Sequence, residues 1–334
     1  MTTFPMKSKN AQPFVIGVGS ALMDILLFES ELFVADHGLI KGGMEMVGQE
    51  RANELLADSA NAFAVRLVPG GSACNTTIGL GRLCEKALFI GTRGDDELGR
   101  TLETSIRSNN VTPHFWKSST PTGRVLSVIT PDAERTMLTY LGASAETSAK
   151  TISPELFRGA DMVHVEGYLM LNEPLIVAVL ESAAAAKVPV SLDLASFTVV
   201  EANPNLIKDL VRKHVSVLLA NEDEARSYTG VSNELDALKI LALDAECAVV
   251  KVGKRGSYIC LNDEITKIKP FGDGPALDTT GAGDLWAAGF LYGLINGKPI
   301  TECGNIASLC GYEVCQVEGA QIPEGGWRRI KQSI

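Results

Sequence analysis

Short apolar runs alternate with amphipathic segments along most of this 334-residue chain, and this alternation constrains the fold more than any other feature. Uninterrupted runs rich in Val, Ile, Leu and Ala predict buried strands. They occur at residues 14–18, 87–90, 162–165, 188–192, 217–220 and 248–252. Apolar residues at helical spacing predict helices between them, over residues 73–83, 98–109, 174–187, 205–213, 222–229 and 234–243. Such alternation favours a doubly wound, largely parallel sheet with helices on both faces, so the predicted class is α/β.

Two segments interrupt the alternation. Residues 44–47 carry β-type side chains after two glycines, and residues 122–140 have the pattern of a hairpin around the polar turn 131–135. We expect these pieces to form a small sheet apart from the main one. A plain extension of the edge of the main sheet remains the alternative.

One glycine-rich turn combines two chemical features. The segment Asp278-Thr279-Thr280-Gly281-Ala282-Gly283-Asp284 precedes an apolar run with helical spacing, residues 285–295. The backbone N–H groups of Gly281, Ala282 and Gly283 therefore lie at a helix N-terminus, which favours an anion. Asp284 lies in the first turn, where the helix dipole should keep it ionised and able to accept a proton. An anion hole beside a base suits phosphoryl transfer to a hydroxyl, although an ordinary turn before a helix has the same composition.

Two further segments suit the binding of a polyol. In Pro69-Gly70-Gly71-Ser72-Ala73-Cys74-Asn75, the paired glycines allow close backbone approach, Ser72 can cap the next helix and Asn75 can bond hydroxyls. Asp24 interrupts the apolar stretch 22–27, where a carboxylate needs a partner such as two vicinal hydroxyls. A tight turn and a surface aspartate are the structural alternatives.

These motifs resemble the two signatures of the PfkB (ribokinase-like) family of sugar and nucleoside kinases. The resemblance extends from residue 14 to about residue 319, and residues 17–24, 70–75, 137–144 and 166–169 look most like the bacterial adenosine-kinase-like branch. It implies a three-layer α-β-α ribokinase-like domain over residues 13–334, after a flexible tail at 1–12. A small β lid would come from inserted segments at about 28–48 and 112–141. It also implies a catalytic base at Asp284, an anion hole at Gly281, Ala282 and Gly283, and substrate contacts from Asp24, Gly70, Gly71 and Asn75.

The resemblance further implies ATP and Mg²⁺. Asn221 and Glu224 match an Asn-x-x-Glu motif that positions Mg²⁺ through water, although they can equally form a helix cap. Lys251, Gly253 and Gly256 resemble a nucleotide-binding turn, for which a plain hairpin is the alternative. Asn305 resembles a position near the adenine base. Asp278 and the Thr280 carbonyl, with Gly319-Ala320, resemble a site for a monovalent cation such as K⁺.

Composition limits the partners and the compartment. The net charge is −10 and no basic patch is visible, which argues against nucleic acid or an anionic membrane as a partner. Seven cysteines without a CxxC pair favour buried reduced thiols over disulfides or structural zinc. His164 and Glu166 have strand spacing that suggests a metal pair, but a core histidine is favoured. No apolar run approaches the roughly 20 residues of a membrane span, so a cytoplasmic enzyme is expected. Exposed lid strands could pair two copies into a homodimer.

Several functions remain open. An adenosine-like nucleoside is the favoured acceptor, and a ribose- or fructose-type sugar is the alternative, since all of them present similar hydroxyls. The chain could also be a catalytically idle ligand-binding protein on the same scaffold. An NAD-dependent enzyme is disfavoured because Gly17-Val18-Gly19 lacks the third glycine of the dinucleotide fingerprint.

Overall fold

The computed structural model describes residues 12–59, 66–84, 86–132 and 134–334. Of the expected tail at 1–12, all but the last residue lies outside the described residues. Within the described part of the chain, none of the helices has the length and apolar character needed to cross a membrane.

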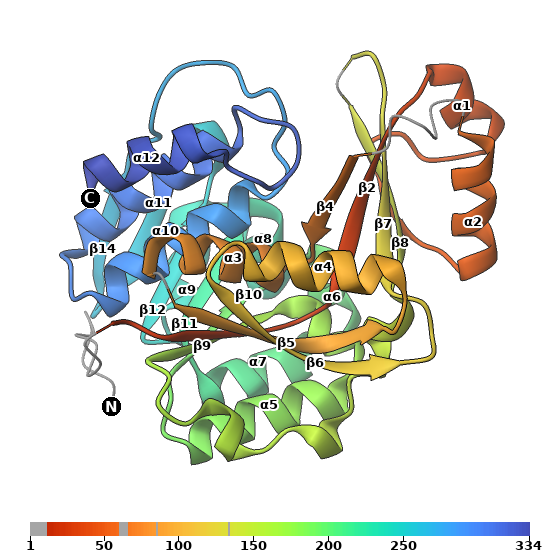
Figure 1. The fold of residues 1–334 in the computed structure, drawn as a ribbon. Coiled ribbons are helices and arrows are strands. Elements are labelled where there is room, and N and C mark those ends of the chain that lie inside the picture. The colour runs from red at the N-terminus through yellow and green to blue at the C-terminus, as the bar shows by residue number, and fades with distance from the viewer. Residues whose placement is uncertain (1–11, 60–65, 85, 133) are drawn as a thin grey trace.

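A nine-stranded sheet forms the centre of the molecule, in the order β14-β13-β12-β11-β10-β9-β1-β5-β6 (Figure 1). Its strands are β1 (Val15–Val18), β5 (Ala87–Gly94), β6 (Val111–Ser118), β9 (Met162–Glu166), β10 (Val190–Asp193), β11 (Val215–Asn221), β12 (Cys247–Lys251), β13 (Ser257–Leu261) and β14 (Glu264–Ile268). Seven neighbouring strands of this sheet run parallel, in the spatial order β6, β5, β1, β9, β10, β11 and β12. The remaining two, β13 and β14, extend it as antiparallel strands. All six strands expected from the apolar runs belong to this sheet, which confirms the α/β class.

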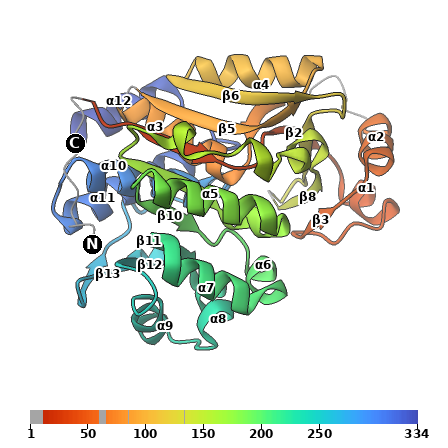
Figure 2. The same ribbon diagram turned by 90° about the horizontal axis from the view of Figure 1, so that it is seen from below.

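Helices cover both faces of the sheet because its strands are apolar on both faces. Val217 and Leu219 of β11 pack into one core cluster, whereas the alternate residues Leu218 and Ala220 pack into the other. Figures 1 and 2 show α3, α10, α11 and α12 on one side of the sheet and α5 and α7 on the other. The helices are α3 (Ser72–Cys84), α4 (Glu97–Arg107), α5 (Glu173–Ala185), α6 (Phe197–Ala202), α7 (Pro204–His214), α8 (Glu222–Thr229), α9 (Glu234–Leu241), α10 (Ala282–Ile295), α11 (Ile300–Val314) and α12 (Glu324–Ser333).

A second, five-stranded sheet stands beside the main one, in the order β3-β8-β7-β2-β4 (Figure 1). Its strands are β2 (Leu22–Phe28), β3 (Met44–Met46), β4 (Arg66–Gly70), β7 (Gly123–Ile129) and β8 (Arg135–Tyr140). Two helices, α1 (Glu31–Asp36) and α2 (Gln49–Asp58), share a separate apolar cluster with it. The predicted small sheet is therefore present, and the expected hairpin forms β7 and β8.

The small sheet has different limits from those expected. Residues 111–118, at the start of the expected second insertion 112–141, form β6 and pair with β5 in the main sheet. Conversely, β2 and β4 belong to the small sheet, although they lie mainly outside the expected segment 28–48. The small sheet thus begins immediately after β1, which brings Asp24 of β2 to the junction of the two sheets. All seven cysteines are free and six of them are buried, as expected.

Candidate functional site

The predicted anion hole lies at the start of α10 and is held by Asp278. The Asp278 carboxylate accepts hydrogen bonds from the Thr280 amide (2.9 Å), the Thr280 hydroxyl (2.7 Å) and the Gly319 amide (2.8 Å). Burial raises the pKa of Asp278, but these hydrogen bonds outweigh it and the pKa lies below its usual value. Gly281 has a φ of +71°, and a Cβ there would lie 2.6 Å from Ala320 Cβ, so the turn requires glycine.

The amides of this turn are not equivalent. The Ala282 amide donates to the Thr279 carbonyl at 3.1 Å, so this member of the expected anion hole is already used. The amides of Gly281, Gly283 and Asp284 have no hydrogen-bond partner within the described residues. They lie at the positive end of a 14-residue helix, which is where an anion is stabilised.

Asp284 is held by the first turn of α3. Its two carboxylate oxygens accept hydrogen bonds from the Ser72 hydroxyl (2.8 Å) and from the Asn75 side-chain amide (2.9 Å). Burial raises the pKa of Asp284 to about 6, and the two hydrogen bonds oppose the rise. The helix dipole, the only influence considered from the sequence, favours the ionised carboxylate, whereas burial is the largest influence on this pKa and raises it. Ser72, expected as a helix cap, instead orients this carboxylate.

Asp24 is a buried carboxylate without a hydrogen-bond donor among the described residues. Its side chain is 4 % exposed, and burial raises its pKa to about 7, with the negative charge of Asp284 contributing and the positive charge of Arg135 opposing. A Cβ on Gly70 would lie 2.1 Å from Asp24 Oδ1. Gly71 has a φ of +97°, and a Cβ there would lie 2.3 Å from the Ser20 carbonyl oxygen. Gly70 therefore allows the chain to pass directly against Asp24, and Gly71 allows it to pass against Ser20. The acceptor capacity of Asp24 remains available.

Glu166, at the end of β9, is a positioning residue that the sequence reasoning did not assign to the site. Its carboxylate accepts hydrogen bonds from the Ser20 and Ala73 amides, both at 2.8 Å. It joins the crossing between the two sheets to the start of α3, which carries Ser72 and Asn75. Within the described residues, no group of three or more His, Cys, Asp or Glu side chains could hold a metal ion, and His164 is buried with its Nδ1 3.3 Å from the Ser191 hydroxyl.

A buried ion pair lies beside the turn. Lys251 Nζ is 2.7 Å from Asp193 Oδ2, and a Cβ on Gly283 would lie 3.2 Å from the same nitrogen. Burial lowers the pKa of Lys251, but Asp193 and Glu224 outweigh it, so the pKa lies above its usual value. The ammonium is therefore charged and adjacent to the unpartnered amides. Asp193 was not found from the sequence, although a carboxylate at the end of a buried parallel strand was the available signal.

Asn221 and Glu224 form a complete capping box. The Glu224 carboxylate accepts from the Asn221 backbone and side-chain nitrogens, both at 2.8 Å, and Asn221 Oδ1 accepts from the Glu224 amide at 2.9 Å. Burial raises the pKa of Glu224 to about 7, and Asp193, Lys251 and Asp284 also influence it. These groups therefore share one electrostatic environment.

The remaining predicted residues lie on the β12–β13 turn and on α11. Gly256 has a φ of +97°, and a Cβ there would lie 2.0 Å from the Ile268 carbonyl oxygen, so the hairpin itself requires this glycine. Gly253 is exposed and borders open space. Asn305 lies on α11 with an exposed side chain, and no hydrogen bond within the described residues connects it to the cluster around Asp284.

A layered α/β fold with a carboxylate beside unpartnered helix N-terminal amides is the arrangement of an enzyme that transfers phosphoryl groups. The chain belongs to the pfkB family of carbohydrate kinases, whose family model matches residues 44–325. It is therefore an ATP-dependent phosphotransferase that acts on a sugar or a nucleoside.

Similar proteins include both adenosine kinases and sugar kinases. The crystal structure of adenosine kinase from Sinorhizobium meliloti superposes with a TM-score of 0.89 at 28% identity, covering 97% of this chain and 100% of that one. A probable sugar kinase from Rhizobium etli gives the same TM-score at 29% identity, covering 96% and 98%. The adenosine kinase of Dictyostelium discoideum is 26% identical over 92% of this chain and 96% of its own.

Proposed function

We propose that this kinase transfers the γ-phosphoryl group of ATP to the primary hydroxyl of a nucleoside, with an adenosine-like nucleoside as the favoured acceptor. The observation that carries the proposal is the position of Asp284, a hydrogen-bonded carboxylate in the first turn of α10. It lies beside amides that have no partner in the described part of the chain. The similarity of this chain to the Sinorhizobium meliloti adenosine kinase, over essentially the whole of both chains, supports the choice of acceptor.

The substrate hydroxyls would be held at the junction of the two sheets. Asp24 is a buried acceptor without a donor among the residues that the structure describes, so two vicinal hydroxyls can complete its hydrogen bonding. Gly71 follows Gly70, whose backbone lies against Asp24, and Asn75 in the first turn of α3 donates to Asp284. A ribose bound in this way directs its primary hydroxyl toward Asp284.

Transfer then needs one proton acceptor and a set of donors for the phosphoryl oxygens. Asp284 takes the proton from the primary hydroxyl as its oxygen attacks the γ-phosphorus, and ADP leaves with the electrons of the broken P–O bond. The negative charge on the phosphoryl oxygens is stabilised by three donors: the Gly281 amide, the Gly283 amide and the Lys251 ammonium. These donors are already oriented by the turn and the Asp193 ion pair, so little reorganisation is required.

The residues near Lys251 fit Mg²⁺ bound through water. Both oxygens of Glu224 already accept hydrogen bonds from Asn221, which leaves the carboxylate able to orient a metal-bound water more readily than to bind the metal directly. Glu224 and Asn221 would hold the hydrated ion, whose charge would balance the phosphate oxygens of ATP.

We also propose that the turn at Asp278 and Thr280 takes a monovalent cation such as K⁺. The lowered pKa of Asp278 keeps its carboxylate ionised, which supports a cation at the neighbouring carbonyls. Exchange of K⁺ for a large organic cation should lower kcat, whereas equal activity in both salts would exclude this site.

We further propose that the small sheet acts as a lid over the bound substrate. It supplies both Asp24 and, at the start of β8, Arg135, whose positive charge opposes the raised pKa of Asp24. All three residues of the edge strand β3 are exposed, so the same sheet offers a surface for pairing two copies. Light scattering in solution would distinguish a dimer from a monomer.

A sugar of the ribose or fructose type is the second candidate acceptor, supported by the similarity to the Rhizobium etli protein. A panel of nucleosides and sugars, assayed for ADP release and then for the phosphorylated position by ³¹P NMR, would decide between them. Phosphorylation of adenosine at the 5′ position with the highest kcat/KM is the expected result. A free sugar as the best acceptor would overturn the nucleoside assignment, and the Asp284→Asn variant serves as the control for contaminating kinases.

A further inference from the structure

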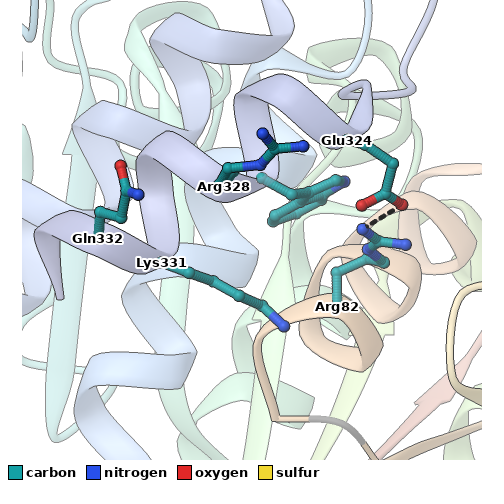
Figure 3. A pocket seen from close by; sticks show the side chains of 6 residues that line it. Arg82, Glu324, Arg328, Lys331 and Gln332 are labelled. Atoms are coloured by element: carbon teal, nitrogen blue, oxygen red, sulfur yellow. Dashed lines mark ion pairs between the residues drawn. The ribbon is translucent and has the colours of Figure 1, made fainter.

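A cavity of about 260 Å³ lies between α3 and α12, away from Asp284 (Figure 3). It is lined by Arg82, Glu324, Trp327, Arg328, Lys331 and Gln332. Three of these side chains are cationic and one is anionic, although the whole chain carries a net charge of −10. The cavity is therefore locally cationic in a protein that is acidic as a whole.

The donor capacity of the cavity is only partly used. Arg82 forms an ion pair of 2.5 Å with Glu324, and its guanidinium lies 5.7 Å from the centre of the Trp327 ring. Its Nε atom is buried and has no hydrogen-bond partner in the part of the chain that the structure describes. Arg328 is exposed and has no ion pair among the described residues, whereas the adjacent Arg329 is paired with Glu313.

The walls of the cavity are fixed by the core. Trp327 is 3 % exposed and packs in one apolar cluster with Leu83 of α3 and Leu285 of α10. Arg82 precedes Leu83 on α3, so the arginine is attached to a rigid helix and not to a loop. A preorganised guanidinium beside a fixed aromatic ring loses little freedom when it binds a ligand.

We propose that this cavity binds a small phosphate-bearing anion, of the size of pyrophosphate or a small phosphate ester. Arginine side chains bond phosphate oxygens in pairs, and the exposed guanidinium of Arg328 has no ion pair within the described residues that would compete with a ligand. The volume is below the roughly 300–1,000 Å³ of clefts that enclose drug-sized ligands, so a whole nucleotide is too large. Arg82 lies ten residues after Ser72, about 15 Å along α3, which separates this site from the catalytic base.

The test is a titration of the full-length protein with inorganic pyrophosphate, followed by the indole N–H signals of its three tryptophans in ¹H–¹⁵N spectra. Trp327→Phe assigns the signal of the cavity. Trp286 lies on α10 in a different apolar cluster and serves as a reference signal outside the cavity. We expect the Trp327 signal to shift saturably and the Trp286 signal to follow a different curve.

Arg328→Glu should weaken the binding that Trp327 reports at least about tenfold, because one charge-assisted contact is replaced by repulsion. Arg328 is exposed, so the variant should fold. The matched control is Arg100→Glu, the same charge reversal at an exposed site on α4, which should leave the binding unchanged. A Trp327 signal that does not move, that moves only together with Trp286, or that responds equally in both variants would refute the site.

Discussion

Removing the hydrogen bond from Asn75 to Asp284 should move the pH dependence of the reaction. This bond, 2.9 Å long, favours the ionised carboxylate and opposes the effect of burial, which raises the pKa to about 6. A hydrogen bond to a charged group is worth about 1.5–3 kcal/mol, which corresponds to roughly one to two pKa units as an upper range. In Asn75→Ala the pKa of the base therefore rises, and a higher pH is needed to ionise it.

The measurement is the pH profile of kcat at saturating acceptor, where the profile reports groups in the enzyme–substrate complex. The wild-type kcat should fall below about pH 6, which defines the acid limb of the profile. The acid limb of Asn75→Ala should lie roughly one pH unit higher. Ser72→Ala should shift the limb in the same direction, because Ser72 bonds the other carboxylate oxygen.

The matched control is Thr76→Val, which keeps the shape of the side chain. Thr76 donates to the backbone oxygen of Asp284 and not to the carboxylate, at 3.2 Å. Its limb should stay at the wild-type position. If Asn75→Ala lowers the rate without moving the limb, or if Thr76→Val moves it equally, the assigned influence of Asn75 on the base is wrong.

Three further predictions concern stability and binding. Asp24→Asn should raise the acceptor KM, and it should raise Tm more at about pH 8 than at about pH 5. The pKa of Asp24 is raised to about 7 in the folded state, so its carboxyl destabilises the fold as the pH rises from the unfolded-state pKa to 7, by up to about 4 kcal/mol. Differential scanning fluorimetry at the two pH values would check this. Gly71→Ala should lower Tm far more than Gly38→Ala, because both residues have positive φ but a Cβ on Gly38 meets nothing within 4 Å; equal losses would contradict the close approach to Ser20. Lys251→Met should leave Asp193 buried without its ion-pair partner, which should lower the free energy of unfolding by about 3–5 kcal/mol. Adding Asp193→Asn should restore Tm but not kcat. Normal turnover of the double variant would show that Lys251 does not belong to the proposed site.

The main sheet was predictable because its signal is local. A strand buried on both faces is apolar at every position, and such runs are visible without knowledge of their neighbours. The limits of the small sheet depend on tertiary pairing. Residues 22–28 contain Asp24 within an apolar run, and β4 is a short segment ending in Pro69-Gly70, so neither has a distinctive strand pattern.

The candidate site was predictable where the backbone itself carries the chemistry. The glycines near Asp24 and Asp284 are required by positive φ or close contact, and glycine pairs stand out in a sequence. Asp193 and Glu166 were not predicted because the sequence around a carboxylate at the end of a strand does not show what the carboxylate contacts. Asp193 contacts a lysine and Glu166 contacts two amides, but either could have faced solvent. The sequence also could not show that burial influences the pKa of Asp284 more than its hydrogen bonds do, because burial is known only from the fold.

The catalytic role of Asp284 can be measured directly as the turnover of Asp284→Asn with the best acceptor of the panel, together with ATP binding. The substitution keeps the size of the side chain but removes the proton acceptor. We predict that kcat falls by about 10²–10⁴-fold while the affinity for ATP changes little. Turnover close to that of the wild type, with the same pH profile, would contradict the assignment of Asp284 as the catalytic base.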